Sequence, residues 1–221
     1  NMLNIKNCDC MDLMKEYPDK HFELAIVDPP YGLQNGKNRY AGGGLHTKSS
    51  VKFGSRFKMA DSYNGKRWDS NLCDDNYFNE LFRVSKNQII WGANYYKQLS
   101  PCRGFIIWDK QQAVDNFSAC EYAYSSFDTP SRIYRLRNYG IFQTDKNVIH
   151  PTQKPVALYE WILTKYAKKG DKILDTHGGS MSIAIACHNL GFDLTACELD
   201  KDYYDAAMKR IEFHRAQKRL F

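Results

Sequence analysis

Four consecutive residues, Asp28-Pro29-Pro30-Tyr31, carry groups that could activate a weakly nucleophilic amine. They end an apolar segment, 22–28, which is rich in branched residues and predicts a buried strand. The exocyclic amine of adenine or cytosine is a poor nucleophile because its lone pair is delocalised into the ring. The Asp28 carboxylate and the Pro29 carbonyl could accept its two N–H groups and expose that lone pair, while the prolines keep the turn rigid. Tyr31 could stack on a base swung out of a duplex.

The electrophile that suits such an amine is a sulfonium methyl group. Transfer of that methyl requires neither a metal ion nor a covalent intermediate with the protein, so we predict no metal site and no cysteine nucleophile. The alternative interpretation of the tetrapeptide is an ordinary turn after a strand, with an exposed Asp28 and a packed Tyr31. The combination of acid, two prolines and aromatic residue after a buried strand favours the chemical interpretation.

A second set of residues, towards the C-terminus, predicts a nucleotide site. A strand over 172–174 leads into Asp175-Thr176-His177-Gly178-Gly179-Ser180, followed by a helix over 181–190 and a strand over 193–197. The two glycines let the backbone approach a ligand at the carboxyl edge of the sheet. Glu198, about twenty residues further on, could accept both ribose hydroxyls. The alternative is a plain strand-to-helix turn with Glu198 as a solvated cap. The turn lacks the glycine patterns of hydride-transferring dinucleotide enzymes and of phosphate loops.

The elements that must position these residues alternate between strand and helix, which predicts an α/β fold with a parallel or mixed sheet and helices on both faces. We expect one domain, residues 1–221, without internal repeats. Predicted strands cover 3–5, 22–28, 88–91, 104–108, 121–125, 132–136, 172–174 and 193–197. We predict five helices. The first follows Asp9 and ends at Met14, the second begins at Asp74 or Asp75, and the third has Pro155 in its first turn. The fourth covers 181–190, and the fifth runs from Asp200 to about Arg215.

A basic, glycine-rich stretch interrupts this alternation between Gln34 and Asp69. It has little apolar periodicity, so we expect a surface loop inserted into the domain. Such a loop can order on a polyanion. The cations predicted to contact nucleic acid there are Lys37, Arg39, Lys48, Lys52, Arg56 and Lys58.

The composition limits the class of protein. The 221 residues carry a net charge of +6, which favours a polyanionic partner, and 43% hydrophobic residues, which is typical of a globular chain. The apolar runs are too short for a membrane span, and the first residues do not form a signal peptide. The seven cysteines show no Cys-x-x-Cys spacing, which indicates reduced thiols in a cytoplasmic protein.

Taken together in their order, these motifs resemble the permuted (β-group) S-adenosylmethionine-dependent DNA amino-methyltransferases, which act on N6 of adenine or N4 of cytosine. The resemblance covers most of the chain outside the basic loop, and the catalytic tetrapeptide precedes the cofactor unit, as in that family. The matching segments are Asp28 to Gly32, Trp91 to Tyr95, Trp108 to Lys110, Glu121, His150 to Pro155, Asp175 to Ser180 and Glu198 to Asp200.

The resemblance implies a Rossmann-like methyltransferase fold with a mostly parallel, seven-stranded sheet containing one antiparallel strand. It implies that S-adenosylmethionine is the cofactor, that double-stranded DNA is the partner, and that the tetrapeptide is catalytic. Many relatives form dimers, so a homodimer is compatible with the resemblance. The residues that would contact the cofactor are Asp28, His150, Thr152, Gln153, Lys154, Asp175, Thr176, His177, Gly178, Gly179, Ser180, Glu198 and Leu199.

Two features depart from the family pattern. His177 stands where the family usually has an aromatic residue, and we expect no proton-transfer role for it. The segment between Phe127 and His150 (128–150), where the family keeps its target-recognition region, is short. Its Arg132, Arg135 and Arg137 could contact phosphates, so recognition could be shared with the basic loop.

Three alternatives stay open on the sequence alone. N4-cytosine methylation is the nearest, although family members with that activity more often carry Ser in place of Asp28. A catalytically silent, nucleic-acid-binding relative is the second, suggested only by His177 in the cofactor turn. Methylation of RNA or of a protein amide is the third, and the order of the motifs disfavours it. We therefore expect site-specific adenine-N6 methylation of DNA, as in restriction–modification.

Overall fold

The computed structural model describes residues 1–32, 72–112, 118–138, 148–150 and 152–217. The chain divides into two compact units, one made of Asn1–Pro29 and Asp74–Phe221 and the other of Pro30–Cys73. All the helices and strands below belong to the first unit. The second unit contains the basic loop, which lies outside the described residues together with its six predicted DNA contacts. The prediction of a single domain stays a prediction.

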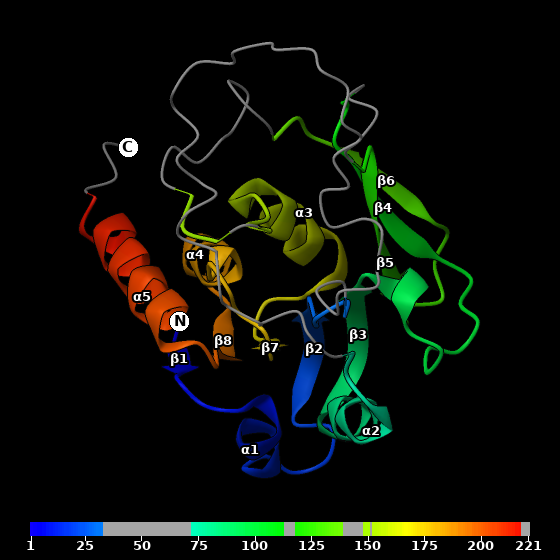
Figure 1. The fold of residues 1–221 in the computed structure, drawn as a ribbon, viewed down its shortest axis with the longest axis horizontal. Coiled ribbons are helices and arrows are strands. Elements are labelled where there is room, and N and C mark those ends of the chain that lie inside the picture. The colour runs from blue at the N-terminus through cyan, green and yellow to red at the C-terminus, as the bar shows by residue number, and fades with distance from the viewer. Residues whose placement is uncertain (33–71, 113–117, 139–147, 151, 218–221) are drawn as a thin grey trace, which may run out of the picture. The chain divides into compact units, whose positions relative to one another are not determined.

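The first unit alternates strands and helices, as the sequence predicts (Figure 1). The strands are β1 (Leu3–Lys6), β2 (Phe22–Val27), β3 (Ser85–Trp91), β4 (Phe105–Asp109), β5 (Cys120–Ser125), β6 (Arg132–Arg135), β7 (Lys172–Asp175) and β8 (Asp193–Cys197). The helices are α1 (Cys10–Lys15), α2 (Asp75–Val84), the short 3-10 helix η1 (Ala93–Tyr95), α3 (Val156–Tyr166), α4 (Ser182–Leu190) and α5 (Lys201–Ala216).

The strands form one sheet in the order β1-β8-β7-β2-β3-β5-β4-β6. Among the strands that the structure describes, only β5 runs against its neighbours, because it pairs antiparallel with both β3 and β4 while β4 pairs parallel with β6. The fold class and the single antiparallel strand are therefore confirmed. The count of seven strands, taken from the family resemblance, is one short for the described residues. The eight strands coincide with the eight segments that the sequence pattern indicates, and β6 extends the sheet by pairing with β4.

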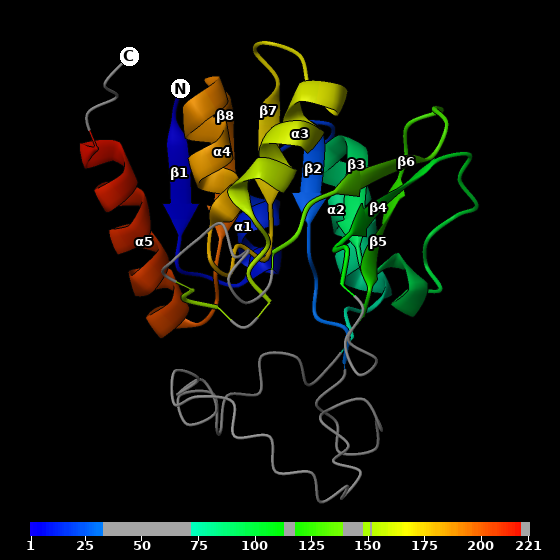
Figure 2. The same ribbon diagram turned by 90° about the horizontal axis from the view of Figure 1, so that it is seen from above.

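Helices cover both faces of the sheet. α3, α4 and α5 lie on one side, and α1 and α2 lie on the other (Figure 2). The side chains of β2 alternate between the two faces of the sheet. On one face, Leu24 and Ile26 join the large core cluster with Leu158 and Ile162 of α3. Most of α4 is buried, and its Ala184 and Ala186 let the helix pack closely on the sheet and on α3.

Side chains at the helix starts behave as local rules predict. Asp9, Asp74 and Asp200 each accept a hydrogen bond from a backbone N–H in the first turn of α1, α2 and α5. The sequence predicts Pro155 in the first turn of α3, but it is the cap residue, and the helix begins one residue later at Val156. The backbone of Pro155 is extended (ψ 144°) and therefore lies outside the helix. No helix within the described ranges is long and apolar enough to cross a membrane.

Candidate active site

Three neighbouring strands bring three carboxylates to one edge of the sheet. β8, β7 and β2 are adjacent and parallel, so their carboxyl ends meet at the same edge. β7 ends with Asp175, while Asp28 directly follows β2 and Glu198 directly follows β8. The sequence prediction that the tetrapeptide and the cofactor unit share one edge is therefore correct for these three side chains.

The glycine turn after β7 is tied to Glu198. One carboxylate oxygen accepts the Gly179 N–H at 2.8 Å, and the other accepts the Asp200 N–H at 2.9 Å. The Gly178 N–H donates to the Cys197 carbonyl at 2.9 Å. A Cβ on Gly178 would overlap the end of the Met181 side chain, so a larger residue would have to displace Met181. Gly179 has a φ of +49°, a conformation that favours glycine. Since a carboxylate can accept about four hydrogen bonds, Glu198 keeps acceptor capacity for ligand hydroxyls.

Asp175 is the most perturbed acid of this edge. Its side chain is only 2% exposed, and burial raises its pKa from 3.8 to about 7. The His177 N–H donates to one Asp175 oxygen at 3.0 Å and opposes that rise, while the charges of Asp28 and Glu198 add to it. Burial thus disfavours the ionised form of Asp175, and a cationic ligand beside it would offset that effect.

His177 is held as a neutral ring. Burial lowers its pKa from 6.5 to about 4. Its Nδ1 lies 2.9 Å from the Thr176 hydroxyl, which in turn lies 2.7 Å from the Tyr77 hydroxyl of α2. The rings of His177 and Tyr77 meet edge to face at 5.3 Å. His177 thus packs as an aromatic ring against Tyr77, and the absence of a proton-transfer role for it stays a prediction.

The segment before α3 covers the glycine turn. The His150 ring lies 3.6 Å from where a side chain on Gly179 would begin, and it packs edge to face on Tyr203 of α5 at 4.5 Å. The Thr152 hydroxyl lies 3.2 Å from His150 Nδ1, and the Gln153 side chain accepts the Ile149 N–H at 3.1 Å. The predicted cofactor segment is therefore brought onto the predicted cofactor turn.

Lys154 makes contacts that the sequence did not predict. Its side chain is 2% exposed, and its ammonium group forms an ion pair with Asp28 and a second one with Glu121 at 3.0 Å. Lys110 pairs with the other Glu121 oxygen at 2.7 Å. The Lys154 ammonium also lies 5.2 Å from the centre of the Trp91 ring. Glu121 and Lys110 matched the family motifs, but no role was assigned to them from the sequence.

The other three residues of the predicted catalytic tetrapeptide have different placements. The Pro29 carbonyl accepts the Tyr96 hydroxyl at 2.8 Å, and Tyr96 packs on Phe78 of α2. Pro30 and Tyr31 belong to the second unit, and their roles stay predictions. Leu199 is 69% exposed beside Glu198, and the Asn7 side chain donates to its carbonyl at 3.1 Å.

The predicted phosphate contacts of the 128–150 segment are separated by β6. Arg132 begins that strand and Arg135 ends it next to Asp109, with which it pairs at 3.3 Å. Arg135 therefore lies at the carboxyl edge, and Arg137 follows it in the segment 136–138, which starts at the same edge. Arg132 lies at the opposite edge. Residues 139–147 of the segment lie outside the described part of the chain.

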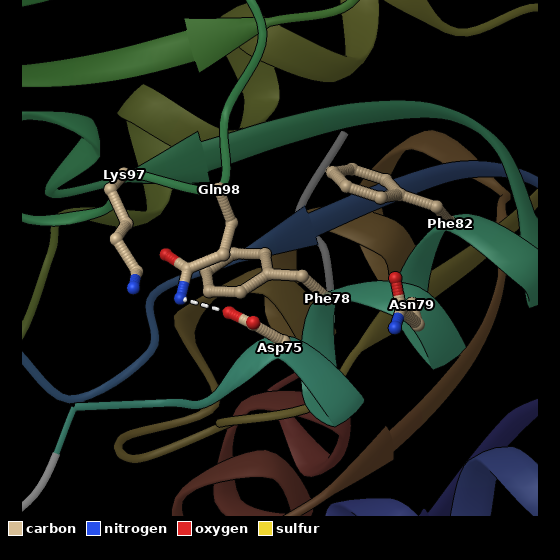
Figure 3. Close-up of a pocket in the computed structure, with 6 residues that line it drawn as sticks. All are labelled: Asp75, Phe78, Asn79, Phe82, Lys97 and Gln98. Carbon is tan, nitrogen blue, oxygen red and sulfur yellow. Dashed lines mark hydrogen bonds between the residues drawn. The ribbon is translucent and has the colours of Figure 1, made fainter.

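A pocket of about 360 Å³ lies apart from these charges, between α2 and the residues that follow η1 (Figure 3). It is lined by Asp75, Phe78, Asn79, Phe82, Lys97 and Gln98, and the Gln98 amide donates to Asp75 at 2.8 Å. None of these residues was predicted to act in the site. Across the ranges described above, no group of three or more His, Cys, Asp or Glu side chains is arranged to hold a metal ion.

Comparisons with known proteins agree with this geometry. Residues 108–209 match the model of a DNA methylase family. The chain is 24% identical over 256 residues to the type II methyltransferase M2.MboI of Moraxella bovis, covering 94% of this chain and 86% of that protein. The fold is similar to that of the M1.HpyAVI–SAM complex, with a TM-score of 0.60 and 20% identity. The match covers 95% of this chain and 100% of that chain.

A third similarity concerns the PvuII DNA methyltransferase, which is cytosine-N4-specific. Its TM-score is also 0.60, with 12% identity and coverage of 100% of this chain and 88% of that one. The resemblance seen in the sequence is thus confirmed. The chain thus resembles the DNA methylases in sequence, with the family model matching residues 108–209, and in fold.

Proposed function

We propose that this protein transfers a methyl group from S-adenosylmethionine to N6 of adenine at a specific site in double-stranded DNA. The observation that carries the proposal is the position of Asp28 at the end of β2, one strand away from Asp175 and two from Glu198. An acceptor for the target amine therefore shares an edge with a nucleotide-type turn.

The acceptor groups of this edge suit S-adenosylmethionine. That cofactor supplies a methyl group on a positively charged sulfur, together with an ammonium group and a ribose. Asp175, Glu198 and Asp28 provide carboxylates, and a cationic group bound beside Asp175 would offset the burial that raises its pKa to about 7. Glu198 would accept the ribose hydroxyls, and the exposed Leu199 would lie against the adenine ring. His150, Thr152 and Gln153 would contact the methionine part.

For this reaction the site must expose the lone pair of the target nitrogen. The Asp28 carboxylate and the Pro29 carbonyl would each accept one N–H of the amine, so that the nitrogen becomes pyramidal. Methyl transfer would form the N–CH₃ bond as the S–CH₃ bond breaks, and Asp28 would accept the proton that the nitrogen loses. The Tyr96 hydroxyl bonded to the Pro29 carbonyl fixes the direction of that acceptor. Tyr31 would stack on the flipped base.

The choice of adenine rests on Asp28, since family members that methylate cytosine more often carry Ser at this position. The fold does not discriminate between the bases, because the cytosine-specific PvuII enzyme is as similar in TM-score as M1.HpyAVI. N4-cytosine methylation is therefore the second candidate. By analogy with the type II methyltransferases that it resembles, the protein would protect DNA in a restriction–modification pair.

The test is incubation with labelled S-adenosylmethionine and unmethylated genomic DNA, followed by nucleoside analysis. We expect labelled N6-methyladenine; N4-methylcytosine would keep the mechanism and correct the base. Asp28→Ala should abolish transfer while largely sparing cofactor binding, and Asp12→Ala, which removes an exposed acid of α1, should change neither. Transfer by Asp28→Ala at the wild-type rate would refute the role of that carboxylate. Binding of DNA without binding of S-adenosylmethionine would favour a catalytically silent protein.

A further inference from the structure

A chain of four alternating charges extends from Asp28 into the sheet edge. In order it contains Asp28, Lys154, Glu121 and Lys110, so the negative and positive charges are equal in number. The Lys154 ammonium is almost fully buried, whereas the side chains of Glu121 and Lys110 are 23% and 24% exposed. Lys154 is thus the interior member of the chain and the one that contacts the predicted catalytic carboxylate.

Burying an ammonium group is costly unless opposite charges surround it. Burial lowers the pKa of Lys154, but the charges and hydrogen bonds of Asp28 and Glu121 outweigh that effect, so the pKa is raised overall. The face of the Trp91 indole lies 5.2 Å from the ammonium and closes it off on another side. Lys154 therefore stays charged, and its position is fixed by groups on three different strands.

The three strands explain why Lys154 is so well fixed. Asp28 follows β2, Trp91 ends β3, and Glu121 lies near the start of β5, which is antiparallel and therefore begins at the carboxyl edge of its neighbours. Lys110, just after β4, holds the outer oxygen of Glu121 and lies 5.0 Å from the centre of the Trp108 ring. Lys154 itself directly precedes the proline that caps α3.

We propose that Lys154 is a positioning residue for the Asp28 carboxylate, and that Glu121 and Lys110 act through it. This inference rests on the proposed methyl transfer and gives Lys154 a role other than the cofactor contact expected from the family resemblance. The ion pair holds one Asp28 oxygen, which sets the rotation of the carboxylate and hence the direction in which it accepts the target N–H.

The test compares Lys154→Met with wild type in two separate measurements on the full-length protein. One is the dissociation constant of S-adenosylmethionine from calorimetry, and the other is the single-turnover rate of methyl transfer at saturating cofactor and DNA. We expect an unchanged dissociation constant and a rate lowered by about 100-fold, because misplacing a catalytic group by an ångström costs that much. Lys86→Met is the matched control: it breaks a Lys–Glu pair of 2.9 Å at the amino end of β3 and should leave both values unchanged.

A second variant covers the case in which Lys154→Met does not fold. Lys110→Met removes the outermost charge and leaves Lys154 between its two carboxylates, so we expect a folded protein with a rate lowered roughly tenfold and unchanged cofactor binding. A purely structural role would lower thermal stability without this separation of rate from binding.

Each result has a distinct meaning. Weaker cofactor binding that parallels the loss of rate would make Lys154 a cofactor ligand and overturn the inference. Wild-type rates in both Lys154→Met and Lys110→Met would overturn it as well, while leaving the proposed function intact. Absence of methyl transfer by the wild-type protein would instead refute the proposed function, and the positioning role with it.

Discussion

Replacing Asp175 by Asn should make the protein more stable at neutral and alkaline pH, although Asp175 belongs to the candidate cofactor site. The carboxyl group is 2% exposed, and burial raises its pKa from 3.8 to about 7. The unfolded chain therefore releases this proton at a lower pH than the folded chain does. The stability contributed by the group is fully present below pH 3.8 and is lost as the pH rises to about 7. The total loss is about 4 kcal/mol, at about 1.4 kcal/mol per pH unit.

His177 acts in the opposite direction over part of the same range. Its pKa is lowered from 6.5 to about 4, so its contribution to stability is present above pH 6.5 and is lost as the pH falls to about 4. In the wild-type protein the two slopes oppose each other between pH 4 and 6.5. Asp175→Asn removes only the Asp175 slope, so the stability of the variant relative to wild type should rise by about 3 kcal/mol across that interval.

The assay is urea denaturation of both proteins at several pH values between 4.5 and 8.5, with the free energy of unfolding extrapolated to water. Asn keeps an oxygen that can accept the His177 N–H, now bonded at 3.0 Å. Any cost of its amide group is independent of pH, so the quantity to examine is how the difference between the proteins changes with pH. Parallel curves for the two proteins would refute the reasoning. The exposed Asp12→Asn is the control and should give such parallel curves.

Two smaller perturbations test other parts of the site. Tyr96→Phe removes the hydroxyl that donates to the Pro29 carbonyl at 2.8 Å. We expect the free energy of unfolding to fall by about 1 kcal/mol in denaturation experiments, and methyl transfer to be slower. An unchanged rate would show that this bond does not set the direction of the carbonyl. Arg135→Ala, at the carboxyl edge, should reduce the slope of the logarithm of the DNA-binding constant against the logarithm of the salt concentration by about 1. Arg103→Ala, which removes an exposed pair with Asp128, should leave that slope unchanged. Equal slopes for both variants would argue against a phosphate contact at Arg135.

Local patterns predicted the elements and their ends well, because both are decided by neighbours in sequence. The caps of α1, α2 and α5 are bonds between residues two or three positions apart. The buried strand that ends before Asp28 and the glycine turn after Asp175 are likewise short-range features. Parallel pairing of alternating strands then places Asp28, Asp175 and Glu198 at one edge, so the core of the candidate site follows from the sequence.

The partners of Lys154 could not be found in this way, because they depend on strand order and direction. Asp28 and Lys154 are 126 positions apart, and nothing near either residue predicts their pairing. Glu121 reaches the carboxyl edge only because β5 is antiparallel; a parallel β5 would place its second residue at the opposite edge. The family resemblance implied one antiparallel strand without saying what that strand brings to the site. Its reversed direction puts an acid beside Lys154, and the buried lysine can then hold Asp28 while keeping its own charge.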